Sequence, residues 1–177
     1  ESVEDTITFG KYKGKTFGFI DNPDYELGSI VSLWAAREEF SGNDILLMDA
    51  DVIFEPRVLG RLTGSRYKNC FLIDKDFDES GEEMKVAVLD KRAVQITREH
   101  DEVGEGIGFF KTSADCNKEF LIALKETIAL NRSADYEEAL DNFIRQVPAG
   151  IEEITGLKWT EVDFPEDISK AESLKMG

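Results

Sequence analysis

Runs of apolar residues divide the chain into buried-type strands and a hairpin. Residues 45–48 (ILLM) and 70–74 (CFLID) are almost uniformly apolar, which is typical of central strands covered on both faces. Residues 84–97 alternate apolar and polar positions on either side of Lys91 and Arg92, which predicts a β-hairpin. Another strand is predicted at 106–111 (GIGFFK). The pattern predicts a sheet whose first strands are fully buried.

The remaining periodic segments predict helices between and after these strands. Apolar residues recur every three or four positions over 29–40, beginning near Ser29, which indicates an amphipathic helix. The other expected elements are a short strand at 17–20 ended by a turn at 21–24, a helix beginning near Pro56, helices near 114–130 and 135–147, a late strand at 158–164 and a closing helix at 165–174. This order predicts an α/β domain with a mixed sheet.

The net charge of the chain limits the classes of molecule that the protein is expected to bind. With 37 acidic and 21 basic residues the net charge is −16, which disfavours nucleic acid and anionic membrane surfaces. Cys70 and Cys116 are too few and too far apart for a zinc motif or a disulfide framework, and they suit a reducing cytosol. His100 is the only histidine and lies in a charged stretch, so mechanisms that need two histidines are excluded. No segment is long and apolar enough to span a membrane.

Two carboxylates follow the first buried strand. Asp49 and Asp51 are two residues apart, so on a strand they point to the same face. In open α/β sheets ligands bind beyond the carboxyl ends of strands, and a Mg²⁺ or Mn²⁺ ion would offset the repulsion between the two acids. The alternative is structural, with one aspartate capping the helix near Pro56 and the other closing a turn.

A second pair of acids occurs near the end of the late strand. Glu161 and Asp163 again share a face on a strand, as a shared metal site would require. A capping box formed by Asp163 and Glu166 is the alternative.

An acidic run at 74–83 partly matches a calcium loop. Asp74, Asp76 and Asp78 occupy the first, third and fifth positions, but Glu79 and Lys85 replace the required glycine and glutamate. We therefore interpret the run as a solvated connection.

Several segments together resemble the nucleotidyltransferase family, nearest the small cytidylyltransferases that act on phosphocholine, aminoethylphosphonate or sugar phosphates. The resemblance covers the chain from Phe17 onward and rests on residues 19–40, 44–56, 82–99, 104–113 and 159–171. It implies a Rossmann-like GT-A fold with a β-hairpin insertion. It also implies a Mg²⁺-dependent transfer of a nucleoside monophosphate from a triphosphate, with CTP favoured, to a small phosphomonoester.

The resemblance assigns roles to individual residues. Asp51 and Asp163 are the expected catalytic residues, and with Glu161 and the supporting Asp49 they form the expected metal site. Such a transfer requires positioning and charge neutralisation but no protein nucleophile.

Two further segments match places where relatives contact substrates. Tyr136, Glu137 and Glu138 match head-group-contacting positions and can face a cationic amine, although an ordinary helix start explains them too. Ser29 and Ser32 match positions that contact nucleotide or substrate, although helix capping also explains Ser29.

One family element has no counterpart in the sequence. Relatives begin with a strand and a Gly-x-Gly-x-Arg loop that holds the triphosphate, whereas residues 9–15 have glycines and lysines without that spacing. We therefore expect one N-terminally truncated nucleotidyltransferase-like domain over 1–177, a poor catalyst by itself. A catalytically incomplete binding module and a nucleotide-sugar-dependent glycosyltransferase are the alternatives, and a homodimer remains open.

Overall fold

The computed structural model describes residues 17–77, 84–97 and 103–174. The strands are β1 (Ile45–Met48), β2 (Val52–Phe54), β3 (Cys70–Asp74), β4 (Lys85–Leu89), β5 (Arg92–Thr97), β6 (Val103–Thr112), β7 (Ala149–Glu153) and β8 (Trp159–Glu161). The helices are α2 (Ser29–Ala35), α3 (Pro56–Gly64), α4 (Asn117–Leu130), α5 (Tyr136–Ile144) and α6 (Asp167–Ser173), with 3-10 turns η1 (Arg37–Phe40) and η2 (Ala114–Cys116). None of these described helices is long and apolar enough to cross a membrane.

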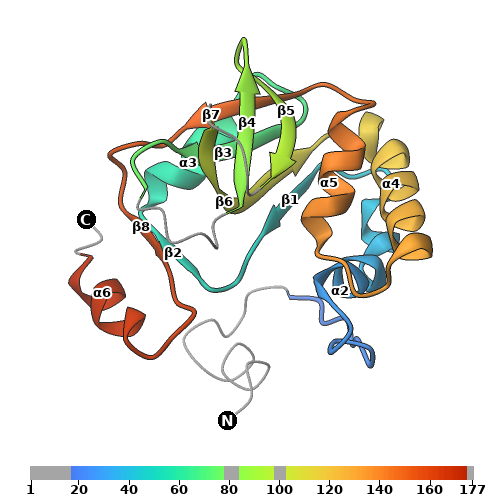
Figure 1. The fold of residues 1–177 in the computed structure, drawn as a ribbon, viewed down its shortest axis with the longest axis horizontal. Helices are drawn as coiled ribbons and strands as arrows, with labels where there is room; N and C mark the ends of the chain where they lie inside the picture. The colour runs from blue at the N-terminus through green and yellow to red at the C-terminus, as the bar shows by residue number, and fades with distance from the viewer. Residues whose placement is uncertain (1–16, 78–83, 98–102, 175–177) are drawn as a thin grey trace.

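Within the described residues the main sheet has six strands in the order β1-β6-β3-β7-β5-β4. The β3–β7 pair is parallel and the other pairs are antiparallel, so the predicted mixed sheet is confirmed. The long strand β6 also pairs with β4, which closes one end of the sheet on itself. Strands β2 and β8 form a separate antiparallel pair, seen beside α6 in Figure 1.

Helices cover both faces of the sheet, with α2, α4 and α5 grouped together at one side of Figure 1. On their face, Phe110 of β6 contacts Phe71, Phe120 and Phe143 at ring-centroid distances of 4.5, 6.0 and 6.1 Å. Aromatic side chains bury large apolar areas, so this cluster joins β3, β6, α4 and α5 into one core.

Helix α3 packs on the opposite face. Val58 and Leu62 are fully buried there against Cys70 and Leu72 of β3. Pro56 is the first residue of α3, where its fixed φ favours helix initiation. Strand β3 is buried along its whole length, as its sequence predicts.

The predicted hairpin is β4–β5. Asp90 and Lys91 form its two-residue turn with φ values of 50° and 63°, the left-handed pair typical of a type I′ turn. This turn matches the twist of the flanking strands and fixes their register.

Some expectations about elements were wrong. Residues 17–20 do not form a strand, and the helix expected over 29–40 ends at Ala35 before η1. Within the described residues β1 is an edge strand, with Leu46 43% exposed, because it pairs only with β6. Strands β2 and β7 were not predicted.

Candidate active site

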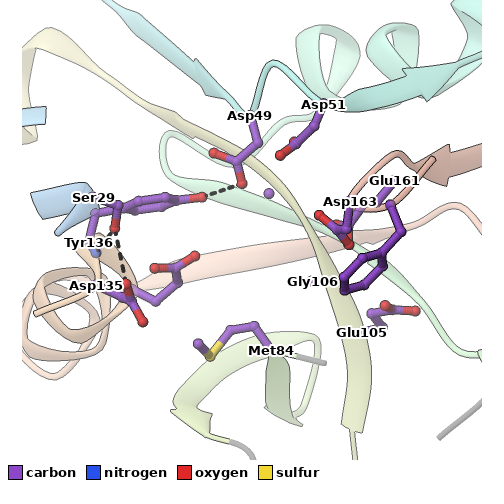
Figure 2. A pocket seen from close by; sticks show the side chains of 13 residues that line it. Ser29, Asp49, Asp51, Met84, Glu105, Gly106, Asp135, Tyr136, Glu161 and Asp163 are labelled. Carbon is purple, nitrogen blue, oxygen red and sulfur yellow. Dashed lines mark hydrogen bonds between the residues drawn. The ribbon is translucent and has the colours of Figure 1, made fainter. Parts of the chain in front are cut away.

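A cavity of about 780 Å³ opens beyond the end of β1 and contains both predicted acid pairs. Figure 2 shows their side chains arranged around one space. The carboxylates that line the cavity are Asp49, Asp51, Glu105, Asp135, Glu137, Glu161 and Asp163. No lysine or arginine is among the described residues of its wall, so the cavity has a concentrated negative charge.

The first acid pair lies in the turn between β1 and β2. Strand β1 ends at Met48 and β2 begins at Val52, so the expectation that Asp49 and Asp51 lie on a strand was wrong. Both side chains nevertheless line the cavity, because the turn carries them past the end of the sheet.

Pairing of β2 with β8 brings the second acid pair beside the first. Val52 lies opposite Glu161 in this pair, and the N–H of Val162 donates to the carbonyl of Asp51 at 3.1 Å. Residues far apart in the sequence are thereby held as neighbours by backbone hydrogen bonds.

Asp49 is fixed by a buried tyrosine. The hydroxyl of Tyr136 donates to Oδ2 of Asp49 at 2.8 Å (Figure 2). Beneath it, a Cβ at Gly108 would lie 2.1 Å from that oxygen, and Gly108 has a φ of +69° that favours glycine. Asp49 therefore occupies a notch that only glycine leaves open. It does not cap α3, whose N-cap has no side-chain hydrogen bond.

Ser29 acts at the start of a different helix from its own. Its Oγ accepts the N–H of Tyr136 at 2.9 Å and lies 3.5 Å from Oδ1 of Asp135. The hydroxyl thus satisfies a free N–H in the first turn of α5 and fixes the tyrosine that holds Asp49. Sequence reasoning assigned Ser29 to a ligand or to capping its own helix, and missed this contact.

Two predicted site residues lie outside the cavity wall. Ser32 accepts a hydrogen bond from Nδ2 of Asn22 at 2.9 Å on the exposed side of α2. Glu138 is exposed, whereas its neighbours Tyr136 and Glu137 line the cavity.

The turn before α6 leaves Asp163 directed toward the cavity. Oδ2 of Asp167 accepts the N–H groups of Asp163 at 3.2 Å and Phe164 at 2.9 Å. The capping box of Asp163 with Glu166 is not formed, since Glu166 is the N-cap and has no side-chain cap bond.

Burial and like charge raise the pKa of several of these acids. Burial raises the pKa of Glu161 to about 7, with further contributions from Asp163, Asp51 and Asp49. Burial also raises the pKa of Glu137 to about 7. The pKa of Asp49 is raised by burial, an effect that the Tyr136 hydroxyl opposes and Asp51 reinforces. A cation in the cavity would relieve this repulsion.

The donor set suits a hard divalent cation, which binds carboxylate oxygens. As the side chains lie, no three His, Cys, Asp or Glu residues of the described chain close around one point. The chemistry of these residues therefore fits a divalent metal ion.

The acidic run at 74–83 is only partly described, because 78–83 lie outside the described residues. Asp74 is 6% exposed and accepts Nε1–H of Trp159 at 2.7 Å and the N–H of Asp76 at 3.0 Å. The expectation of a solvated run was therefore wrong for Asp74. His100 and residues 9–15 also lie outside the described residues.

Comparison with known proteins identifies the fold. No family model matches the chain. The bifunctional IPC transferase and DIPP synthase of Thermococcus kodakarensis is 28% identical over 157 residues, which are 86% of this chain and 33% of that protein. The inositol-1-phosphate CTP transferase from T. maritima superposes with a TM-score of 0.67 at 19% identity, covering 86% of this chain and 65% of that one. This chain has the nucleotidyltransferase fold.

A second solved structure agrees with this assignment. The CTP:phosphocholine cytidylyltransferase from Streptococcus pneumoniae has a TM-score of 0.67 at 17% identity, over 85% of this chain and 65% of that one. The resemblance to the nucleotidyltransferases, near the small cytidylyltransferases, is thereby confirmed. The chain spans a third of the length of the curated relative and about two thirds of these two structures.

Replacing Tyr136 with phenylalanine tests the support of Asp49. The variant leaves a half-buried carboxylate without its hydroxyl donor, so the free energy of unfolding should fall by about 1–3 kcal/mol. Urea unfolding at neutral pH measures this change. Tyr25→Phe is the control, since Tyr25 is exposed and its hydroxyl donates to Oε1 of the neighbouring Glu26 at 3.3 Å. Equal small changes in both variants would contradict the role given to Tyr136.

The pKa of Glu137 predicts a pH-dependent stability. Its folded pKa of about 7 exceeds the ordinary 4.5, so folding takes up a proton between these values. The free energy of unfolding contributed by Glu137 therefore falls as pH rises from 4.5 to about 7, then levels off. Glu137→Gln removes this contribution and should stabilise the protein by about 1–3 kcal/mol near pH 8, with little effect near pH 4.5.

Urea unfolding across this pH range checks the prediction, with exposed Glu138→Gln as the matched control. A stability gain that is the same at every pH, or that appears equally in Glu138→Gln, would show that Glu137 is not the group that titrates.

Proposed function

We propose that the protein is a Mg²⁺-dependent nucleotidyltransferase that joins a nucleoside monophosphate, with CTP as the favoured donor, to a small phosphomonoester. The observation that carries this proposal is the meeting of two carboxylate pairs, from the β1–β2 turn and the end of β8, in one cavity. The fold is similar to those of an inositol-1-phosphate CTP transferase and a CTP:phosphocholine cytidylyltransferase, and the sequence is similar to that of a bifunctional IPC transferase and DIPP synthase. These likenesses support a transferase reaction of the same class.

Four acids of the cavity would hold the ion. Asp51, Glu161 and Asp163 are the proposed ligands, and Asp49 supports them from its notch against Gly108 and Tyr136. A bound Mg²⁺ neutralises phosphate charge and orients the triphosphate. The cavity lacks basic residues among its described lining, so without a cation its charge would repel a nucleotide.

The proposed transfer needs no protein nucleophile. A phosphate oxygen of the acceptor bonds to the α-phosphorus of the triphosphate, and the bond from that phosphorus to the bridging oxygen breaks to release pyrophosphate. The protein contributes by holding the two reactants in line. Asp51 and Asp163, which line the cavity on adjacent segments, are the proposed catalytic residues.

The α5 side of the cavity is the proposed acceptor side. Glu137 lines the wall there beside Asp135, and such carboxylates favour an acceptor that carries a cationic group. Tyr136 contributes indirectly, since its hydroxyl already binds Asp49. Ser29 is likewise engaged with Tyr136, and Ser32 and Glu138 lie outside the wall. The two described cysteines are free thiols, which suits a reducing compartment. We therefore propose a cytosolic location.

Substitution of Asp51 tests the proposal. Asp51→Asn keeps the shape of the side chain and removes one charged ligand, so Mg²⁺-dependent pyrophosphate release should fall by on the order of 100-fold or more. The assay combines the intact protein with CTP, Mg²⁺ and a panel containing inositol 1-phosphate and phosphocholine, and ³¹P NMR identifies the product. Asp90→Asn, the same charge change at the exposed hairpin turn, should retain full activity.

Other products would favour the alternatives. Release of a nucleoside diphosphate from a nucleotide sugar would indicate a glycosyltransferase. Head-group binding without turnover in the intact protein would indicate a binding module. Undiminished metal-dependent activity in Asp51→Asn would remove Asp51 from the site.

A further inference from the structure

A second cavity, of about 570 Å³, brings three basic and two acidic side chains together on the α3 face of the sheet. Gly150 and Glu152 of β7 lie opposite Cys70 and Leu72 in the register, and both of those β3 residues belong to the core under α3. The cavity shares no lining residue with the acidic one. It is therefore a separate place in the fold.

Three cations from three different segments converge on this cavity. Arg61 comes from α3, Arg66 from the loop that follows, and Lys91 from the hairpin turn. No ion pair within 4.0 Å joins any of them to an acid of the described residues. The chain has a net charge of −16, so a group of three basic side chains is unusual for this protein.

The acids in the same wall already have partners. Glu153 forms an ion pair with Nζ of Lys75 at 2.9 Å, and Oε1 of Glu152 accepts the Ser65 hydroxyl at 2.9 Å. Glu152 acts on Arg66 as a longer-range charge, as one minor cause of its raised pKa after the Tyr67 hydroxyl. The arginines and Lys91 thus retain donors for a further anion.

The cavity wall is ordered by an aromatic ring. The ring of Tyr67 packs closely against Gly150, where a Cβ would come within 2.2 Å of its Cγ. The guanidinium of Arg66 sits over this ring at 5.2 Å from the centroid, and its Nη2 donates to the Tyr67 hydroxyl at 3.4 Å. Stacking holds the guanidinium in place, so less side-chain freedom is lost when an anion binds.

The backbone also fixes the third cation. Lys91 has a left-handed φ of 63° in the hairpin turn, and its carbonyl accepts the N–H of Ile151 at 3.3 Å. This bond ties the turn to β7 beside the arginines. The base of the Lys91 side chain is therefore held at the rim of the cavity.

We propose that this cavity binds the phosphoryl group of a small soluble molecule. Arginine forks match phosphate oxygens in paired, charge-assisted hydrogen bonds, and the volume is in the range of small-ligand sites. The strong negative charge of the chain as a whole disfavours an extended polyanion such as nucleic acid or a membrane. The inference stands independently of the proposed transferase reaction, because it involves none of the acidic cavity.

Calorimetric titration with inorganic phosphate and with pyrophosphate tests the inference in the intact protein. The titration is run with EDTA, so that no divalent ion can draw the probes into the acidic cavity. The double variant Arg61→Gln, Arg66→Gln removes two charges and keeps the polar stems. Its dissociation constant for pyrophosphate should rise about tenfold or more relative to the unsubstituted protein.

The control variant also removes two positive charges, but from a helix that does not line the cavity. Lys118→Gln, Lys125→Gln alters two exposed lysines of α4 and should leave the dissociation constant within about twofold. Absence of binding to the unsubstituted protein, equal weakening in both double variants, or unchanged binding in the arginine variant would overturn the inference. Binding to phosphatidic acid vesicles without binding to the free anions would overturn the small-molecule assignment.

Discussion

Repulsion among half-buried and exposed carboxylates that share one wall is the constraint around which the acidic cavity is built. The backbone pairing of β2 with β8 holds Asp51 next to Glu161, and burial with neighbouring charges raises the pKa of Glu161 to about 7. Two hydrogen bonds hold the acids in place despite this repulsion. The Tyr136 hydroxyl donates to Asp49, and Ser29 accepts the backbone N–H of Tyr136. Such concentrations of perturbed acids are typical of functional sites.

The elements of the fold that have a clear local sequence pattern were predictable. Strand β3 is apolar from Cys70 to Ile73, as expected of a strand covered on both faces, and the β4–β5 hairpin shows alternation around a two-residue turn. The two acid pairs were also visible as short motifs, Asp49 with Asp51 and Glu161 with Asp163. Their convergence on one cavity followed from the family resemblance and the rule for strand ends, even though the first pair lies in a turn.

What escaped prediction depends on contacts between distant segments. Strand β7 is short and contains Gly150, and its place beside β3 is set by parallel pairing. No spacing along the chain indicates that Tyr136 binds Asp49, or that Gly108 is required because a Cβ would meet that carboxylate. The basic cavity likewise joins Arg61 and Lys91, which become neighbours only after the hairpin turn is tied to β7.

The central claim is that the acid pairs form one divalent-cation site. Adding substoichiometric Mn²⁺ to the ¹⁵N-labelled protein tests it most directly, because the paramagnetic ion broadens the amide signals nearest to it. The account predicts that the amides of Asp51, Gly108 and Val162 broaden first, while those of Tyr67 and Lys91 stay sharp. Broadening centred on another acidic segment, such as the one around Asp76, or no selective broadening at all, would contradict it.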